Sequence, residues 1–123
     1  MPSSHHAVLW IDHTTARIVQ FDAEHVQVDT VRTHKHHGKH QHHDEHAKAE
    51  FFNEICHSLE GISEVLVVGP HAGITDFKNF TEKHRPPITD QLVAYEVQGQ
   101  ASESQLVAMA RKFFAQYDRM FES

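Results

Sequence analysis

The sequence contains a single cysteine, Cys56, so no disulfide can form within the chain and a secreted disulfide scaffold is excluded. It also lacks any apolar run that approaches the roughly 18 residues of a membrane span. The polar start, residues 1–6, has no apolar core of the kind that a signal peptide requires. These absences predict a cytoplasmic protein without a membrane segment.

Net positive charge is missing as well. The 11 Lys and Arg residues stand against 17 Asp and Glu residues, which gives a formal net charge of −6 at pH 7 with neutral His. A negative sum gives no support for general nucleic-acid binding, so such a role has to rest on a local patch. The outlier is histidine, with 14 residues. Because the unperturbed His pKa is about 6.5, the sign of the net charge can reverse close to neutral pH.

With 123 residues, 39% of them hydrophobic, the chain is long and apolar enough for one domain with one core, residues 1–123. Four branched apolar residues in a row, residues 65–68, predict a strand that is covered on both faces, as in the interior of a parallel sheet. The glycine-bounded segment 69–73 follows and opens a helix. This places the segment at the carboxyl edge of the sheet, where open α/β folds usually have their sites.

The order of the remaining elements predicts the fold class. Three strands joined by short turns must form an antiparallel meander, and strands separated by a helix should be parallel, with a right-handed crossover. Ser102 and Gln105 form a capping-box signature at the start of a long last helix. The order β-β-β-α-β-α-β-α predicts an α/β, ribonuclease H-like three-layer domain, a five-stranded mixed sheet with helices on both faces. The expected strands are residues 7–12, 16–21, 26–32, 64–69 and 91–97, and the expected helices are residues 47–59, 74–84 and the segment after Ser102.

Residues 33–46 contain no apolar side chain, which predicts an exposed loop. Imidazole is a good ligand for zinc, nickel or copper, and residues four apart are adjacent on a helical turn, so the histidines of this loop are candidate ligands for zinc or nickel. The alternatives are a loop that responds to pH or contacts RNA, and a plain solvated loop. The candidate metal ligands are His34, His36, His37, His40, His42, His43 and His46, and the candidate RNA contacts are Arg32, Lys35, Lys39 and Gln41.

Two stretches resemble a known family. Residues 65–80, VLVVGPHAGITDFKNF, resemble the strand, glycine loop and Phe-Lys helix in the middle domain of archaeal and eukaryotic peptide-chain release factors and of the ribosome-rescue protein Pelota. Residues 9–18, LWIDHTTARI, are similar to small bacterial members of that superfamily, sometimes labelled translational machinery proteins. The resemblance covers about residues 7–121 and implies the fold and an association with ribosomes or RNA.

The motif that carries hydrolysis in the release factors is incomplete here. In that family, the loop after the third strand carries Gly-Gly-Gln, which assists peptidyl-tRNA hydrolysis; the nearest string in this chain is residues 38–41, GKHQ. Without paired glycines the backbone cannot easily take the unusual conformations that such a loop needs. The hydrolytic role is therefore not carried onto Gln41.

A metal-dependent nuclease is not expected either. Such a site requires carboxylates that converge from strand ends and a helix to hold two ions. Asp12 is suitably placed and Glu50 or Glu54 could join it, but residues 67–69, VVG, offer no third acid. Asp12 is therefore expected to form a turn, and Cys56 is expected to be an inert helical thiol.

Together these observations predict a non-catalytic, translation-associated domain that requires no cofactor and binds the ribosome or RNA. The alternative is a His-rich protein that binds a transition metal through residues 34–46. No catalytic residue is expected in either case.

Overall fold

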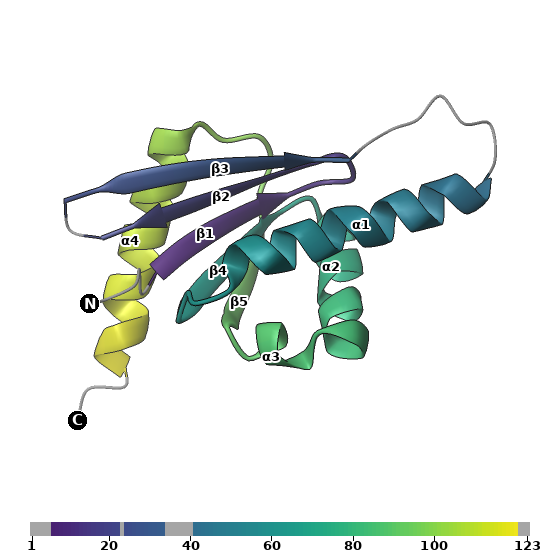
Figure 1. The fold of residues 1–123 in the computed structure, drawn as a ribbon. Helices are drawn as coiled ribbons and strands as arrows, with labels where there is room; N and C mark the ends of the chain where they lie inside the picture. Colours follow the sequence, from purple (N-terminus) through teal and green to yellow (C-terminus); the bar gives the residue numbers. More distant parts are fainter. Residues whose placement is uncertain (1–5, 23, 34–40, 121–123) are drawn as a thin grey trace.

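The computed structural model describes residues 6–22, 24–33 and 41–120, with the backbone alone for residues 41–45. Within these residues the elements are five strands and four helices (Figure 1). The strands are β1 His6–Ile11, β2 Thr15–Phe21, β3 Val26–Arg32, β4 Glu64–Gly69 and β5 Leu92–Val97, and the helices are α1 Gln41–Leu59, α2 His71–His84, α3 Pro86–Thr89 and α4 Glu103–Met120. None of the helices in this part of the chain is long and apolar enough to cross a membrane.

The five strands form one mixed sheet in the order β3-β2-β1-β4-β5. Strand β2 is antiparallel to both β1 and β3, whereas β4 is parallel to both β1 and β5. This is the topology of a ribonuclease H-like domain, so the predicted meander and the predicted five-stranded mixed sheet are confirmed. Strand β1 lies in the middle of the sheet, and β3 lies at one edge.

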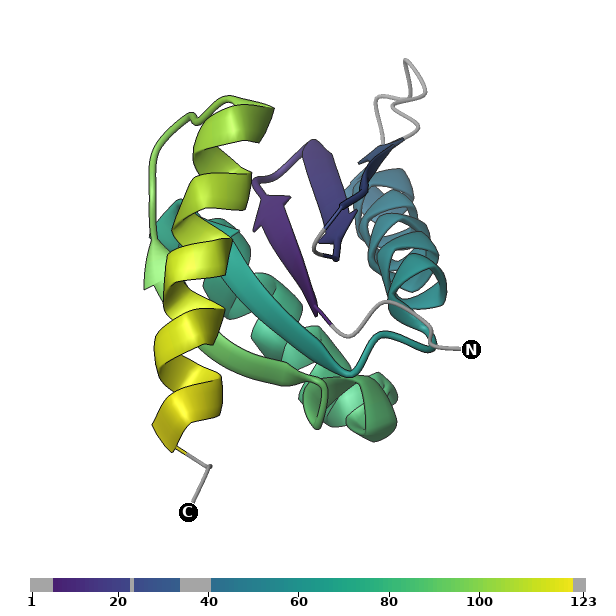
Figure 2. The same cartoon turned by 90° about the vertical axis from the view of Figure 1, so that its left-hand side faces the viewer.

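Strand β4 is buried on both faces because helices cover both sides of the sheet (Figure 2). The four residues Val65, Leu66, Val67 and Val68 have no exposed surface. Alternate residues belong to two separate cores, one formed with α1 and α2 and the other with α4. The strand therefore has no solvent face, which explains the absence of polar alternation in its sequence.

Gly69 and Gly73 are required by the close approach of the end of β1. Gly69 has a φ of 143°, and a Cβ atom there would overlap the carbonyl oxygen of Ile11. A Cβ atom at Gly73 would lie 2.8 Å from the same oxygen. Neither position has room for a side chain, so the turn between β4 and α2 is determined by packing.

Helix α1 begins earlier than predicted. It starts at Gln41 instead of residue 47, so the last six residues of the predicted loop 33–46 are helical and that loop boundary is wrong. The apolar stripe of the helix begins only at Phe51. Residues 41–46 are all polar, so hydrophobic periodicity gives no signal for the first turns of the helix.

A short extra helix, α3, follows α2. Pro86 and Pro87 occupy the first positions of α3. Proline is tolerated there because the first N–H groups of a helix have no intrahelical acceptor. The helical conformation is interrupted at Arg85, with φ −140° and ψ 61°, and α3 begins at the next residue.

Helix α4 is fixed to the sheet around its N-terminus. The predicted capping box is confirmed: the Ser102 N–H donates to Gln105 Oε1 at 2.8 Å, and the Gln105 N–H donates to Ser102 Oγ at 3.1 Å. Just before it, Trp10 Nε1 donates to the carbonyl oxygen of Gly99 at 3.0 Å, and Arg17 Nη2 donates to that of Ala101 at 2.6 Å. The Trp10 side chain is itself buried.

Candidate functional site

Polar side chains suited to binding lie at two opposite edges of the sheet. The carboxyl edge is where β1, β3, β4 and β5 end and where α1 and α2 begin. The amino edge is where β1 and β4 begin, and α4 ends beside it. Figure 1 shows the start of α1 at one end of the molecule and the end of α4 at the other.

The His-rich segment leaves the sheet at the carboxyl edge. Arg32, the last residue of β3, pairs with Thr15, and the Thr33 N–H donates to the carbonyl oxygen of Thr14 at 2.9 Å. These bonds fix the point of departure, and the Arg32 side chain is exposed. Six of the predicted site residues lie outside the described residues: His34, Lys35, His36, His37, Lys39 and His40.

The other predicted residues belong to the first turns of α1. The backbone at Gln41, His42 and His43 is helical, so residues 42 and 46 lie one turn apart, as the predicted pairing of metal ligands requires. The His46 side chain is 79% exposed, and its Nε2 lies 3.7 Å from Glu50 Oε2. Of the seven predicted metal ligands, His46 alone has a described side chain.

Asp12 and Cys56 behave as expected from the sequence. Asp12 Oδ1 accepts hydrogen bonds from the N–H groups of Thr14 and Thr15 at 2.9 and 2.8 Å, so its carboxylate closes the turn between β1 and β2. The Cys56 side chain is fully buried, and burial raises the pKa of its thiol to about 11. The thiol therefore stays protonated at neutral pH and is a poor nucleophile.

Helices α1 and α2 meet at a groove of about 320 Å³ on the outside of the molecule. Lys48 Nζ donates to Asp76 Oδ2 at 2.8 Å across it, and Lys48 also lies over the ring of Phe52 at 5.9 Å. An exposed ion pair of this kind contributes at most about 1 kcal/mol. It holds the polar beginning of α1 near the body of the domain without fixing it strongly.

The amino edge carries a group of side chains that the sequence did not reveal, which we call the amino-edge cluster: His6, Glu64 and Asp118. His6 Nε2 lies 3.0 Å from Glu64 Oε1 and 3.0 Å from Asp118 Oδ2. His6 and Glu64 are paired residues at the starts of the parallel strands β1 and β4, and Asp118 comes from the last turn of α4. Because the three residues come from distant parts of the chain, no local motif could have indicated the cluster.

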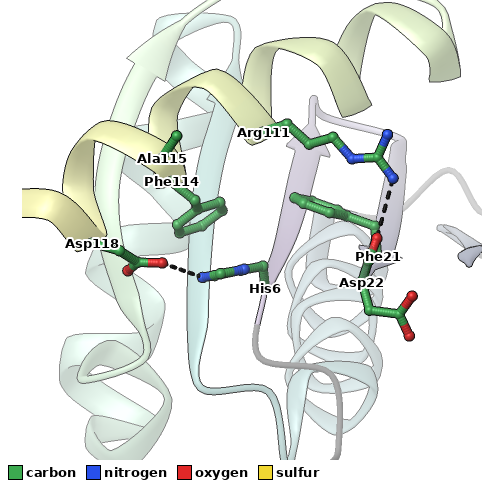
Figure 3. Close-up of a pocket in the computed structure, with 7 residues that line it drawn as sticks. All are labelled: His6, Phe21, Asp22, Arg111, Phe114, Ala115 and Asp118. Atoms are coloured by element: carbon green, nitrogen blue, oxygen red, sulfur yellow. Dashed lines mark hydrogen bonds and ion pairs between the residues drawn. The ribbon is translucent and has the colours of Figure 1, made fainter. Parts of the chain in front are cut away.

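The amino-edge cluster is partly buried and carries excess acidic groups. Burial raises the pKa of the Glu64 carboxyl, and the neighbouring Asp118 carboxyl raises it further, against an opposing effect of His6. The His6 ring stacks on Phe114, with centroids 4.2 Å apart. Beside the ring is a cavity of about 250 Å³ lined also by Phe21, Arg111 and Asp118 (Figure 3).

The fold and these two edges define an α/β domain of ribonuclease H-like topology with polar clusters at both ends of its sheet. Comparison with protein-family models and with curated proteins found no match. Among solved structures, the chain is similar to Thermoplasma acidophilum Pelota, with a TM-score of 0.63 and 13% identity over 85% of this chain. Archaeoglobus fulgidus Pelota gives a TM-score of 0.61 with 18% identity over 87%, and the archaeal translation termination factor aRF1 gives 0.60 with 13% identity over 94%.

The resemblance inferred from residues 9–18 and 65–80 is thus confirmed at the level of the fold. The chain spans only part of those structures, covering 31% and 30% of the two Pelota chains and 39% of aRF1. The matched region is therefore about one third of each longer protein.

Proposed function

We propose that this chain is a non-catalytic, translation-associated domain that binds the ribosome or its RNA through the His-rich segment at the carboxyl edge. The observation that carries the proposal is the likeness in fold, with TM-scores of 0.60 to 0.63, to Pelota and to an archaeal translation termination factor. Binding to ribosomes would place the protein in the cytoplasm. The absence of a Gly-Gly pair in residues 38–41, GKHQ, argues against hydrolysis of peptidyl-tRNA.

The His-rich segment supplies the local positive charge that the whole chain lacks. Arg32 is exposed at the end of β3, and Lys35, Lys39 and the histidines follow it in the sequence. Contacts of lysine and arginine with phosphates release counterions, so binding through them weakens as the salt concentration rises. Protonation of the histidines adds charge below about pH 6.5, so binding to RNA should strengthen on acidification.

Cosedimentation with purified ribosomes over a range of salt concentrations tests this proposal. In the variant Lys35→Ala/Lys39→Ala we expect weaker binding and a salt dependence whose log–log slope is smaller by about 2, one for each lost phosphate contact. The matched control is Lys112→Ala/Arg119→Ala, which removes the same charge from α4 and should leave the slope unchanged. Equal behaviour of the two variants, or binding that does not respond to salt, would contradict the proposal.

A second candidate function is the binding of a transition metal by the His-rich segment. The observation that favours it is the early start of α1, which places residues 42 and 46 one turn apart in a helix, with Glu50 beside His46. Neutral imidazole and carboxylate groups bind zinc or nickel, and protons compete for them below about pH 6.

The two functions can be separated with the same ribosome assay and zinc calorimetry. The substitution His42→Ala/His46→Ala should lower zinc affinity. It should leave ribosome binding unchanged in zinc-free buffer above about pH 7.5, where imidazole groups are mostly neutral and the lysines remain. Lys35→Ala/Lys39→Ala should weaken ribosome binding and leave zinc affinity unchanged, because ammonium groups are not metal ligands. If zinc affinity is unchanged in the His42→Ala/His46→Ala protein, the helical pair is not the metal site.

A further inference from the structure

Three potential metal-ligand atoms converge at the amino edge of the sheet, away from the His-rich segment. Among the described residues, His6, Glu64 and Asp118 form the one group whose ligand atoms all lie within 4.8 Å of one another. Each comes from a regular element: the first residue of β1, the first residue of β4 and the last turn of α4. The backbone pairing of β1 with β4 and the packing of α4 on the sheet therefore bring the three side chains together.

The imidazole ring is held in place by its neighbours. It stacks on Phe114 with an interplanar angle of 24°, and the Phe21 ring lies 6.1 Å away on the adjacent strand β2. The His6 and Glu64 side chains are 25% and 28% exposed, and Asp118 is 43% exposed. A ligand ring fixed by packing loses little freedom on binding an ion, which favours affinity.

The hydrogen-bonding capacity of the cluster is unbalanced. The Nε2 atom of an imidazole carries at most one proton, yet one carboxylate oxygen from each of Glu64 and Asp118 lies 3.0 Å from it. Two carboxylates face a single donor, and the pKa of Glu64 is raised accordingly by burial and by Asp118. A cation with two positive charges would neutralise both carboxylates and accept the imidazole lone pair.

We propose that the amino-edge cluster is a binding site for one divalent transition-metal ion, held by His6 Nε2 and by one carboxylate oxygen each from Glu64 and Asp118. A nitrogen and two oxygen donors suit zinc or manganese better than calcium or magnesium, which prefer oxygen alone. In a tetrahedral site with bonds of about 2.0–2.2 Å, neighbouring ligand atoms lie about 3.3–3.6 Å apart. The two 3.0 Å separations from His6 Nε2 to the carboxylates therefore need to open by about half an ångström, and the ligand atoms of Glu64 and Asp118 already lie within 4.8 Å of each other.

The cavity next to the cluster provides the remaining coordination positions. It has a volume of about 250 Å³, and both His6 and Asp118 line it, as Figure 3 shows. Three protein ligands leave a fourth position of a tetrahedral ion for water or for a small external ligand. The cavity is large enough to hold several water molecules, each of which occupies about 30 Å³ in the liquid.

The test uses a background protein in which the seven histidines of residues 34–46 are replaced by alanine, so that the His-rich segment cannot contribute. Isothermal titration calorimetry with zinc should find one ion bound per chain. Glu64→Gln and Asp118→Asn keep the shape of each side chain and remove the charge. Each should weaken binding by about 100-fold or more, since even outer-shell partners of a metal ligand contribute about 10- to 100-fold.

The matched control is Asp22→Asn, which makes the same chemical change in the same cavity. Asp22 lines the cavity but does not belong to the cluster, so its replacement should leave zinc affinity unchanged. Manganese provides a second measurement: as a paramagnetic ion it should broaden the NMR signals of His6, Phe114 and Asp118 most strongly. Circular dichroism confirms that each variant is folded.

Several results would overturn the proposal. Absence of zinc binding in the background protein would do so. So would a zinc affinity in the Glu64→Gln or Asp118→Asn protein that equals the affinity of the background protein. An equal loss in the Asp22→Asn protein would show a general effect of charge instead of coordination. None of these results depends on whether the chain binds ribosomes, so the site and the proposed function can fail separately.

Discussion

The two edges of the sheet hold histidine in opposite ways. Residues 34–46 of the sequence contain seven histidines, and the His46 side chain, near the start of α1 at the carboxyl edge, is 79% exposed, with one partner at 3.7 Å. At the amino edge the His6 side chain is 25% exposed, stacked on an aromatic ring and 3.0 Å from each of two carboxylates. The carboxyl edge has the ligand chemistry in its sequence, whereas the amino edge has it in a fixed geometry.

This difference shows that ligand density and ligand geometry are separate properties. A run of histidines satisfies almost any spacing, so it selects no coordination geometry by itself. Three side chains from β1, β4 and α4 have a defined arrangement because each is attached to a packed element. The predictions below test how differently the two edges depend on the packing around them.

The largest expected effect concerns two glycines at the ends of β4, namely Gly69, its last residue, and Gly61, shortly before it. Gly69→Ala at the carboxyl edge should lower the free energy of unfolding by about 4 kcal/mol, because the new Cβ would overlap the Ile11 carbonyl at a φ of 143°. Gly61→Ala, before β4, should lower it by only about 1 kcal/mol, because φ is 84° but no atom lies within 4 Å of the new Cβ. Urea unfolding of both variants measures the difference, and equal losses would show that the close approach of β1 is not limiting.

A smaller effect is expected where α4 is attached to the sheet. Trp10→Phe should lower the free energy of unfolding by about 2 kcal/mol, because it leaves a cavity in a buried site and removes the hydrogen bond to Gly99. Asp118→Asn, at the other end of α4, should change it by less than about 1 kcal/mol in buffer with a chelator, because the ion pair with His6 is partly exposed. Thermal unfolding monitored by circular dichroism compares the two. A larger loss in the Asp118→Asn protein would show that α4 is held to the sheet mainly by Asp118 and not by Trp10.

Small effects are also expected in the two turns of the meander. Asp12→Ala at the carboxyl edge removes the acceptor for two backbone N–H groups and should lower the free energy of unfolding by about 1 kcal/mol.

At the amino edge, Asp22 Oδ1 accepts from the N–H groups of Glu24 and His25 at 2.8 and 2.7 Å. These hydrogen bonds hold the pKa of the Asp22 carboxyl below its usual value, and the bond from the Glu24 N–H has the largest effect.

The sign of the resulting pH dependence follows from the lowered pKa of Asp22. The stabilising contribution is complete above the usual Asp pKa of about 3.9 and is lost as the pH falls through the lower folded value. Asp22→Asn keeps an oxygen acceptor that does not titrate, so its stability should fall less than that of the wild type below about pH 4. Urea unfolding between pH 3 and 6 checks this, and parallel curves for the two proteins would contradict it.

The sequence was sufficient for the fold wherever burial leaves a periodic or continuous apolar pattern. Residues 65–68 predicted a strand covered on both faces, and Ser102 with Gln105 predicted the start of α4, and both are observed. It failed at the start of α1, where residues 41–46 are polar and periodicity carries no information. It also gave no indication of α3, because two prolines signal the end of one helix as readily as the start of another.

What the sequence determined by itself is therefore the order of the elements, the mixed sheet and the concentration of histidine after β3, since these depend on local pattern and composition. Only the tertiary structure decided which distant side chains meet. His6, Glu64 and Asp118 come together because β1 pairs with β4 in parallel and α4 packs across them, and this register is fixed by the two cores. Convergence of this kind depends on contacts between elements, so it leaves no mark in the sequence around each residue.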